Sequence, residues 1–285
     1  MPPFAPGQSA VTCSYLRFED VAMDGRLMPI AMSAMTAGLW RDVLVDHPGA
    51  ANAIKQGIVP ILTRLVLVSS GERIRPDRQI EARAGFELAH QQAGDKLFML
   101  VWAETRGVAG KLSRSNAAAG DSVVAGTLFA EHTFTRLLAP PGQRAVTSLD
   151  VDGYPRIPEA SYDAPPATSA EDAPAGARWL DELSADDADF AFSLDHTDPN
   201  QHVNSLVYIR LFLDAAFRRL AARGHAGKLR STAIDIAYRK PCFAGERVRA
   251  MLRLYEHGDA LGLAGHIVGA SDGKPRCHVR VSIDR

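Results

Sequence analysis

A run of ten residues, DHTDPNQHVN at 195–204, holds two aspartates, two asparagines and two histidines. Aspartate and histidine side chains accept and release protons in enzyme reactions, and amide side chains orient water or a carbonyl group. The eighteen residues that follow, 205–222, are mostly apolar and predict one long helix. A helix N-terminus offers free backbone amides and a partial positive charge. The sequence therefore predicts acid–base chemistry at the start of a buried helix.

The predicted helix is apolar on nearly all of its sides, so neighbouring elements must cover most of it. Four runs after it alternate apolar and polar residues at period two, which is typical of half-buried antiparallel strands. The first half of the chain has the same order, with a helix-rich stretch over 32–57 and four strand-like runs behind it. We therefore predict an α+β fold of two fused units, each an antiparallel sheet wrapped around a long central helix. The predicted strands lie at 61–70, 78–91, 96–107 and 122–138, and at 231–241, 246–258, 260–270 and 275–284.

Residues 139–189 differ from both halves because they are rich in Pro, Ala, Ser and Asp and show little periodicity. This composition is typical of a linker that lies on the surface. The predicted organisation is an N-terminal unit over 1–138, a linker over 139–189 and a C-terminal unit over 190–285 that carries the polar motif.

The composition excludes several classes of protein. With 285 residues, a formal net charge of −1 and 46% apolar residues, the chain can form a substantial core and has no basic excess for nucleic acid. Cys13, Cys242 and Cys277 are too few and too widely spaced for a disulfide framework or a zinc site, so we expect a cytoplasmic location and no metal. No run of about 18 uncharged apolar residues predicts a membrane span, and the N-terminus lacks the pattern of a signal peptide.

The run 198–204, followed by Tyr208 and a long helix, resembles the acyl-ACP thioesterases of plants and bacteria. The pattern of that family is D-x-N-x-H-V-N-N-x-x-Y, and its members carry two hotdog units in one chain, each a sheet around a helix. The resemblance implies that Asp198, Asn200 and His202 are catalytic, with Asn200 orienting the water or the carbonyl group.

A second stretch, YRKPC at 238–242, is similar to the family's YRREC and places Cys242 at the family's cysteine. The chain departs from the family at Ser205, which replaces an asparagine, and at Pro241, which replaces a glutamate implicated in catalysis. Glu246 would supply a carboxylate only if the turn is rearranged. An unactivated cysteine is more often a small apolar side chain than a nucleophile, so we do not expect Cys242 to attack the substrate.

Thioester hydrolysis requires a polarised carbonyl, an activated water and a proton for the departing thiolate. We expect backbone amides near Val203 and Asn204 to hold the oxyanion, and Tyr208 to complete the substrate-binding set. Asp198 is the predicted base or nucleophile, and His202 is the predicted proton shuttle. Structural alternatives remain open: Asp198 and Asn204 are also common helix N-caps, and His202 and Tyr208 are also ordinary supporting residues.

Basic residues are concentrated over 217–249, where nine Lys and Arg residues stand against Asp235 and Glu246. Acyl carrier proteins are acidic, and such a surface beside the site would steer them. The alternative is that these are ordinary solvated faces of a helix and strands.

The predicted function is hydrolysis of an acyl thioester of acyl carrier protein or coenzyme A, in fatty-acid or polyketide-type biosynthesis, without a cofactor. The resemblance implies that the N-terminal unit shapes an acyl pocket, which TAGLW (36–40) and LFMLVWAE (97–104) would line. The fused pair would act as a monomer or a homodimer. One alternative is a non-catalytic acyl-thioester-binding module, which Pro241 favours. Another is a hydratase or dehydratase, although the hydratase pattern D-x-N-P-x-H is one residue longer.

Overall fold

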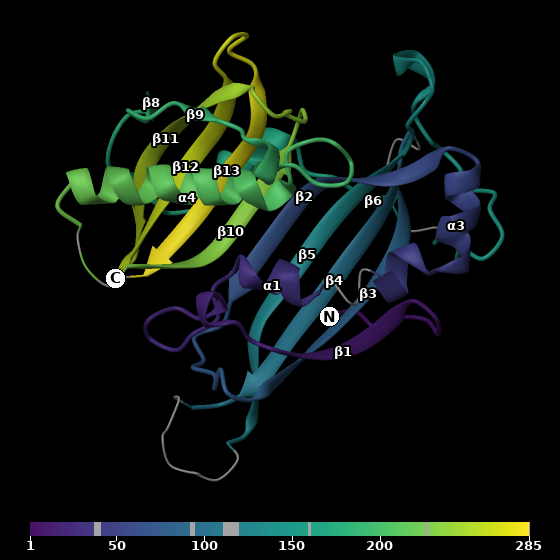
Figure 1. The fold of residues 1–285 in the computed structure, drawn as a ribbon, viewed down its shortest axis with the longest axis horizontal. Helices are drawn as coiled ribbons and strands as arrows, with labels where there is room; N and C mark the ends of the chain where they lie inside the picture. Colours follow the sequence, from purple (N-terminus) through teal and green to yellow (C-terminus); the bar gives the residue numbers. More distant parts are fainter. Residues whose placement is uncertain are drawn as a thin grey trace. The chain divides into compact units, whose positions relative to one another are not determined.

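The computed structural model describes residues 1–36, 41–91, 95–110, 120–158, 161–225, 227 and 229–284. The chain forms two compact units, Met1–Ala164 and Pro165–Arg285. Each unit contains an antiparallel sheet (Figure 1).

The sheet of the first unit has the order β1 (Ser9–Tyr15), β3 (Gln79–Gln91), β4 (Leu97–Val108), β5 (Ser122–Arg136) and β2 (Ile58–Ser69). All neighbours in this order pair antiparallel, and β6 (Ser161–Tyr162) adds to β3 in parallel. Phe86, Met99 and Phe134 pack together in its core with no more than 1% exposure. The four long strands follow the predicted runs because their apolar residues recur at the positions that a strand buries.

The helical segments of the first unit are short. They are α1 (Ala31–Met35), the π-helical turn η2 (Arg41–Val45) and α3 (Pro48–Lys55), with 3-10 turns at Phe18–Asp20 (η1) and Pro141–Gln143 (η3). Pro48 has no amide hydrogen and occupies the first turn of α3, where that hydrogen would have no helical acceptor. The long central helix predicted for this unit is therefore unconfirmed in the described residues.

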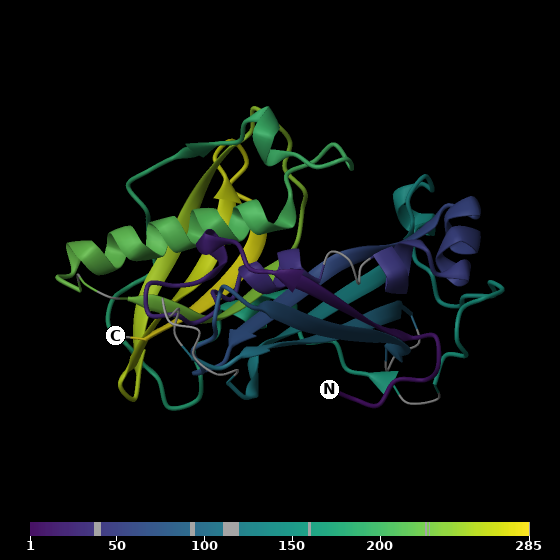
Figure 2. The ribbon, with the colours of Figure 1, turned by 60° about the horizontal axis from the view of Figure 1, so that its bottom comes forward.

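The second unit has the sheet order β10 (Arg230–Tyr238), β13 (Pro275–Asp284), β12 (Ala260–Gly269) and β11 (Arg247–His257). Three two-residue strands pair with the outer edge of β11: β7 (Arg178–Trp179), β8 (Ser184–Ala185) and β9 (Phe190–Ala191). The helix α4 (Ser205–Ala222) lies across one face of this sheet in both views (Figures 1 and 2).

α4 begins and ends where its sequence requires. The side chain of Asn204 caps its N-terminus by accepting from the Leu206 amide at 3.0 Å. Gly224 follows its last turn at a φ of 78°, a conformation that glycine adopts without a steric penalty. Eighteen residues extend about 27 Å, and the buried side includes Ile209, Phe212 and Ala216. The predicted helix over 205–222 has these bounds.

The structure divides the predicted linker, residues 139–189, between the two units. β6 joins the first sheet, whereas the 3-10 turn η4 (Ala167–Glu171), β7 and β8 belong to the second. Ala170 is fully buried, and burial alone would raise the pKa of Glu171, but the imidazoles of His266 and His278 hold that pKa at about 2. Composition did not reveal these contacts because each ordered segment is too short to show periodicity.

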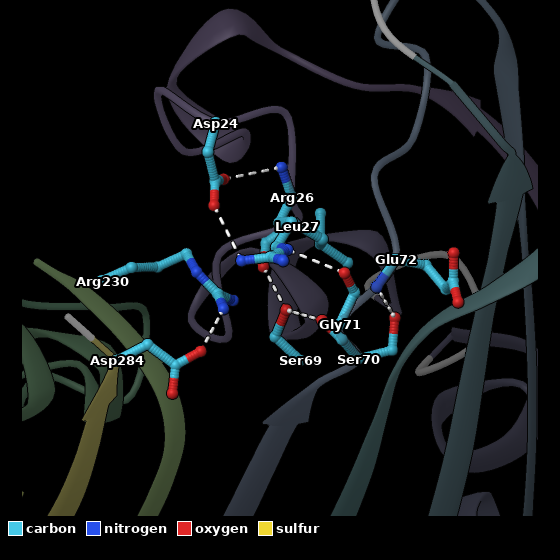
Figure 3. A network of polar contacts seen from close by, with 9 residues as sticks. All are labelled: Asp24, Arg26, Leu27, Ser69, Ser70, Gly71, Glu72, Arg230 and Asp284. Atoms are coloured by element: carbon cyan, nitrogen blue, oxygen red, sulfur yellow. Dashed lines mark hydrogen bonds and ion pairs between the residues drawn. The ribbon is translucent and has the colours of Figure 1, made fainter. Parts of the chain in front are cut away.

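Two polar networks at strand ends are drawn in Figure 3, one in each unit. In the first unit, Arg26 Nε donates to the Gly71 carbonyl at 2.7 Å, and its guanidinium pairs with Asp24. In the second unit, Arg230 at the start of β10 pairs with Asp284 at the end of β13. Each network fixes the end of a strand within its own unit.

No helix in the described part of the chain combines the length and the apolar composition that crossing a membrane requires.

Candidate active site

The polar motif forms a tight hairpin directly before α4. Thr197 and Val203 pair as an antiparallel bridge, and the Asp198 amide donates to the His202 carbonyl at 3.0 Å. The Asp198 carbonyl accepts from the Gln201 amide at 2.9 Å, and Gln201 has a φ of 64°. Three-residue hairpin loops commonly combine a β-turn with a following left-handed residue. Aspartate followed by proline favours that turn, so DPN is also a turn signature.

The hairpin brings together two of the three predicted catalytic side chains. Asp198 Oδ1 lies 3.8 Å from His202 Nδ1, and the side chains are 18% and 38% exposed, respectively. Asp198 Oδ1 also accepts from the Asn200 amide at 2.9 Å. Within the described residues no hydrogen bond reaches Asp198 Oδ2, which leaves this oxygen open to a water molecule. Asn200 is exposed at the tip of the hairpin, and its predicted role in orienting the substrate stays a prediction.

The two backbone amides predicted to bind the oxyanion are already engaged. The Val203 amide donates to the Cys242 carbonyl at 2.8 Å, and the Asn204 amide donates to the His196 carbonyl at 2.9 Å. The prediction that these amides are free for substrate is therefore wrong, because they hold the hairpin to its neighbours. In the first turn of α4, the Ser205 amide has no acceptor among the residues that the structure describes.

Val203, Asn204 and Tyr208 have structural contacts in the described residues, and their predicted contacts with substrate stay a prediction. Val203 is 2% exposed, and the side chain of Asn204 is the helix cap. Tyr208 is 3% exposed, and its hydroxyl accepts from the Cys242 amide at 2.8 Å. Cys242 therefore holds the hairpin with its carbonyl and Tyr208 with its amide.

Neither Cys242 nor Glu246 is arranged to act as a nucleophile or a base beside His202. Burial raises the pKa of the Cys242 thiol, so the thiolate that attacks a thioester is disfavoured. The Glu246 carboxylate lies 3.8 Å from the guanidinium of Arg276, a side chain that is 3% exposed and that also pairs with Asp272. Among the described carboxylates, Asp198 is the one within ion-pair reach of His202.

The predicted basic surface is largely neutralised within the second unit. Seven of its nine cations pair with five acidic residues that lie outside 217–249 in the sequence, and Arg239 has no ion pair within the described residues, so local counting overestimates the positive charge. The structure favours the alternative of ordinary paired surface residues, and Lys228 lies outside the described residues. The pairs are Arg218 with Asp186, Arg219 and Arg223 with Asp181, Arg230 with Asp284, Arg247 and Arg249 with Asp189, and Lys240 with Asp272.

The predicted acyl-pocket residues of the first unit are partly described. The run 97–104 lies in β4, where Leu97 and Met99 join one buried cluster and Phe98 and Leu100 join another. Both faces of this strand are therefore packed, as a strand core requires. The run TAGLW falls largely on residues 37–40, which lie outside the described residues.

One supporting residue received no role from the sequence. The ring of His196 accepts from the Ser193 amide at 2.9 Å and packs against Phe190, while its carbonyl holds the Asn204 amide. His196 belongs to the motif DHTD, so its position beside Asp198 was the available signal. It orders the hairpin from one side as Cys242 does from the other.

The fold of the whole chain is that of double hotdog thioesterases. No protein-family model and no curated protein matches the sequence, but solved structures match it over nearly its full length. An acyl-ACP thioesterase from Bacteroides thetaiotaomicron superposes with a TM-score of 0.61 at 14% identity, covering 97% of this chain and 98% of its own. The 12:0-ACP thioesterase from Umbellularia californica gives 0.56 at 11% identity and covers 98% of both chains.

A Lactobacillus plantarum protein named as an oleoyl thioesterase is similar in the same way, with a TM-score of 0.65, 14% identity, and coverage of 98% of this chain and 97% of its own. At this identity the likeness establishes the fold alone. It confirms the resemblance to acyl-ACP thioesterases and the predicted hotdog fold.

Proposed function

We propose that the chain hydrolyses an acyl thioester at the hairpin before α4. The observation that carries this proposal is the pairing of Asp198 with His202, 3.8 Å apart and partly exposed, on a hydrogen-bonded turn at a helix N-terminus. A second support is that the fold is shared with proteins named as acyl-ACP thioesterases.

In the proposed reaction, Asp198 Oδ2 takes a proton from a water molecule, and the hydroxide formed attacks the thioester carbonyl carbon. The Ser205 amide is the proposed donor to the developing oxyanion, at the positive end of the α4 dipole. When the tetrahedral intermediate collapses, the carbon–sulfur bond breaks and the thiolate leaves. The proton held by Asp198 returns to the thiolate through His202, which lies beside it.

The proposed substrate and biosynthetic setting are those that the sequence predicts. The substrate is an acyl carrier protein or coenzyme A thioester, and the setting is fatty-acid or polyketide-type biosynthesis in the cytoplasm. α4 is the proposed central helix of its hotdog unit, and α1, η2 and α3 take that place in the first unit. We propose a further role for the first unit in shaping the acyl pocket.

The test is release of thiol from a panel of acyl-CoA and acyl-ACP thioesters of increasing chain length. Asp198→Asn preserves the oxygen that accepts from the Asn200 amide but removes the base, so kcat is expected to fall by about 10²–10⁴-fold with stability unchanged. Asp195→Asn is the matched control, because it makes the same change at an exposed position three residues earlier. Cys242→Ser is expected to retain activity.

The results separate the proposal from its rivals. Near-normal turnover by Asp198→Asn would refute the role of the base and leave Asp198 as a turn residue. Tight acyl-thioester binding without thiol release would instead identify a binding module, the function that Pro241 and the Glu246–Arg276 pairing favour.

A further inference from the structure

Three potential metal ligands meet on the sheet of the second unit. Glu171 is the last residue of η4, and His266 on β12 is the direct cross-strand partner of His278 on β13. Glu171 Oε2 lies 2.8 Å from His266 Nδ1, and Glu171 Oε1 lies 3.3 Å from His278 Nδ1. One ligand atom from each residue lies within 4.8 Å of the other two.

The three side chains of the cluster are mostly buried, but two of them are partly exposed to solvent. The side chains of Glu171 and His266 are 23% and 19% exposed, whereas that of His278 is 6% exposed. The Nδ1 atom of His278 is buried, and its polar neighbour among the described residues is Glu171 Oε1 at 3.3 Å, in a geometry that does not make a hydrogen bond. Buried polar atoms are rarely left in this state, and an ion or an ordered water is a common explanation.

This cluster and the candidate active site lie on opposite faces of the sheet of the second unit. α4 packs on β13, and Cys277, Val279 and Val281 on alternate positions of that strand are fully buried, which places Cys277 on the α4 side. Successive side chains in a strand point to opposite faces, so His278 points away from α4. Arg280 is on that same far face, where it pairs with Asp235 and donates to the carbonyl of Asp172, the residue after Glu171.

We propose that Glu171, His266 and His278 bind one divalent transition-metal ion, and that this ion fastens the segment around η4 to β12 and β13. Two imidazoles and one carboxylate form a ligand set that zinc accepts, with a fourth position left for water. Hard cations such as calcium and magnesium prefer oxygen ligands, so the two imidazoles select against them. Glu171 and His266 are 95 residues apart in sequence, so the ion would cross-link distant segments of the unit.

The sequence predicts a protein without a metal, and the proposed ion site differs from that prediction. Spacing rules detect ligands that are neighbours on one turn or helix. Here the two histidines meet through strand register, and the carboxylate arrives from a stretch that reads as a linker. The proposed ion does not depend on the proposed hydrolase activity, because the two sites share no residue.

The experiment is titration of chelator-treated full-length protein with Zn²⁺ alone by calorimetry, and with Co²⁺ followed by its visible absorption. One ion per chain is expected, with a rise in melting temperature on adding Zn²⁺. Glu171→Gln and His278→Gln should each weaken binding by at least about 100-fold, because even the loss of an outer-shell partner costs 10–100-fold. His257→Gln, which changes an exposed histidine of the same unit, should bind like the wild type.

Two outcomes would overturn the proposal. The first is the absence of stoichiometric binding by the wild type, which would leave the cluster as a hydrogen-bonded network. The second is equal binding by the wild type and Glu171→Gln, which would place the ion elsewhere. If His278→Gln does not fold, the half-buried Glu171→Gln carries the comparison, and anomalous scattering at the zinc edge from wild-type crystals locates the ion.

Discussion

Removing the hydroxyl of Tyr208 tests whether this residue supports the site or contacts the substrate. The sequence predicts a substrate-binding residue, whereas in the structure the hydroxyl accepts from the Cys242 amide at 2.8 Å in the interior. Tyr208 is 3% exposed and Cys242 is fully buried, so no water replaces the lost acceptor in Tyr208→Phe.

The expected cost follows from that burial. A buried donor left without a partner costs about 1–3 kcal/mol, more than the net value of an ordinary hydrogen bond. The matched control is Tyr238→Phe, which removes a 3.1 Å bond to the carbonyl of Ser205. That carbonyl lies in the first turn of α4 and keeps its helical donor, so the expected cost is about 0.5–1.5 kcal/mol.

The assay combines urea unfolding with steady-state kinetics on the best thioester of the panel. Tyr208→Phe should lower the unfolding midpoint more than Tyr238→Phe does, with KM unchanged below the transition. A variant with wild-type stability and a raised KM would refute this reasoning and restore the substrate contact.

Two further perturbations test how the chain is held. Gln201→Gly should stabilise the second unit by about 0.5–1 kcal/mol in urea titrations, since glycine relieves the left-handed φ of 64° at the cost of some backbone entropy; a loss of stability would contradict this. Burial lowers the pKa of His132 to about 4 from its usual 6.5, so its contribution to stability is complete above pH 6.5 and is lost as the pH falls toward 4. This pKa shift corresponds to about 3 kcal/mol of stability. Urea titrations at pH 7 and pH 4.5 should therefore show that the free energy of unfolding depends less on pH in His132→Asn than in the wild type.

Helices and strands were predictable from the sequence where one buried face makes apolar residues recur at a regular spacing. The helix over 205–222 and the strands that follow have buried faces that repeat along the sequence, so composition and spacing place them within a few residues. The segment between the units was not predictable in the same way. Its ordered pieces, such as β6 and η4, span two to five residues and are fixed by partners far away in sequence.

The candidate site was predictable in its residues but not in its hydrogen bonds. Asp198 and His202 are separated by four positions, so a short hairpin is enough to bring them together. Which backbone amides remain free depends on the carbonyls of His196 and Cys242, and the second of these lies some forty residues away. No local sequence pattern indicates that the Val203 amide already donates to a carbonyl. No local pattern indicates either that the arginines on α4 pair with aspartates outside the helix.

The proline at position 241 reduces the number of carboxylates that could act as the base, but it does not exclude hydrolysis of a thioester. If a glutamate stood there, two carboxylates would compete for the role of base. Glu246 cannot take its place in the observed turn, because its carboxylate lies beside the buried guanidinium of Arg276. A hydrolase with this site must therefore rely on Asp198, the one described carboxylate within ion-pair reach of His202. The carbonyls of Cys242 and His196 hold the hairpin from two sides, and these hydrogen bonds keep the side chains of Asp198 and His202 together without a glutamate at position 241.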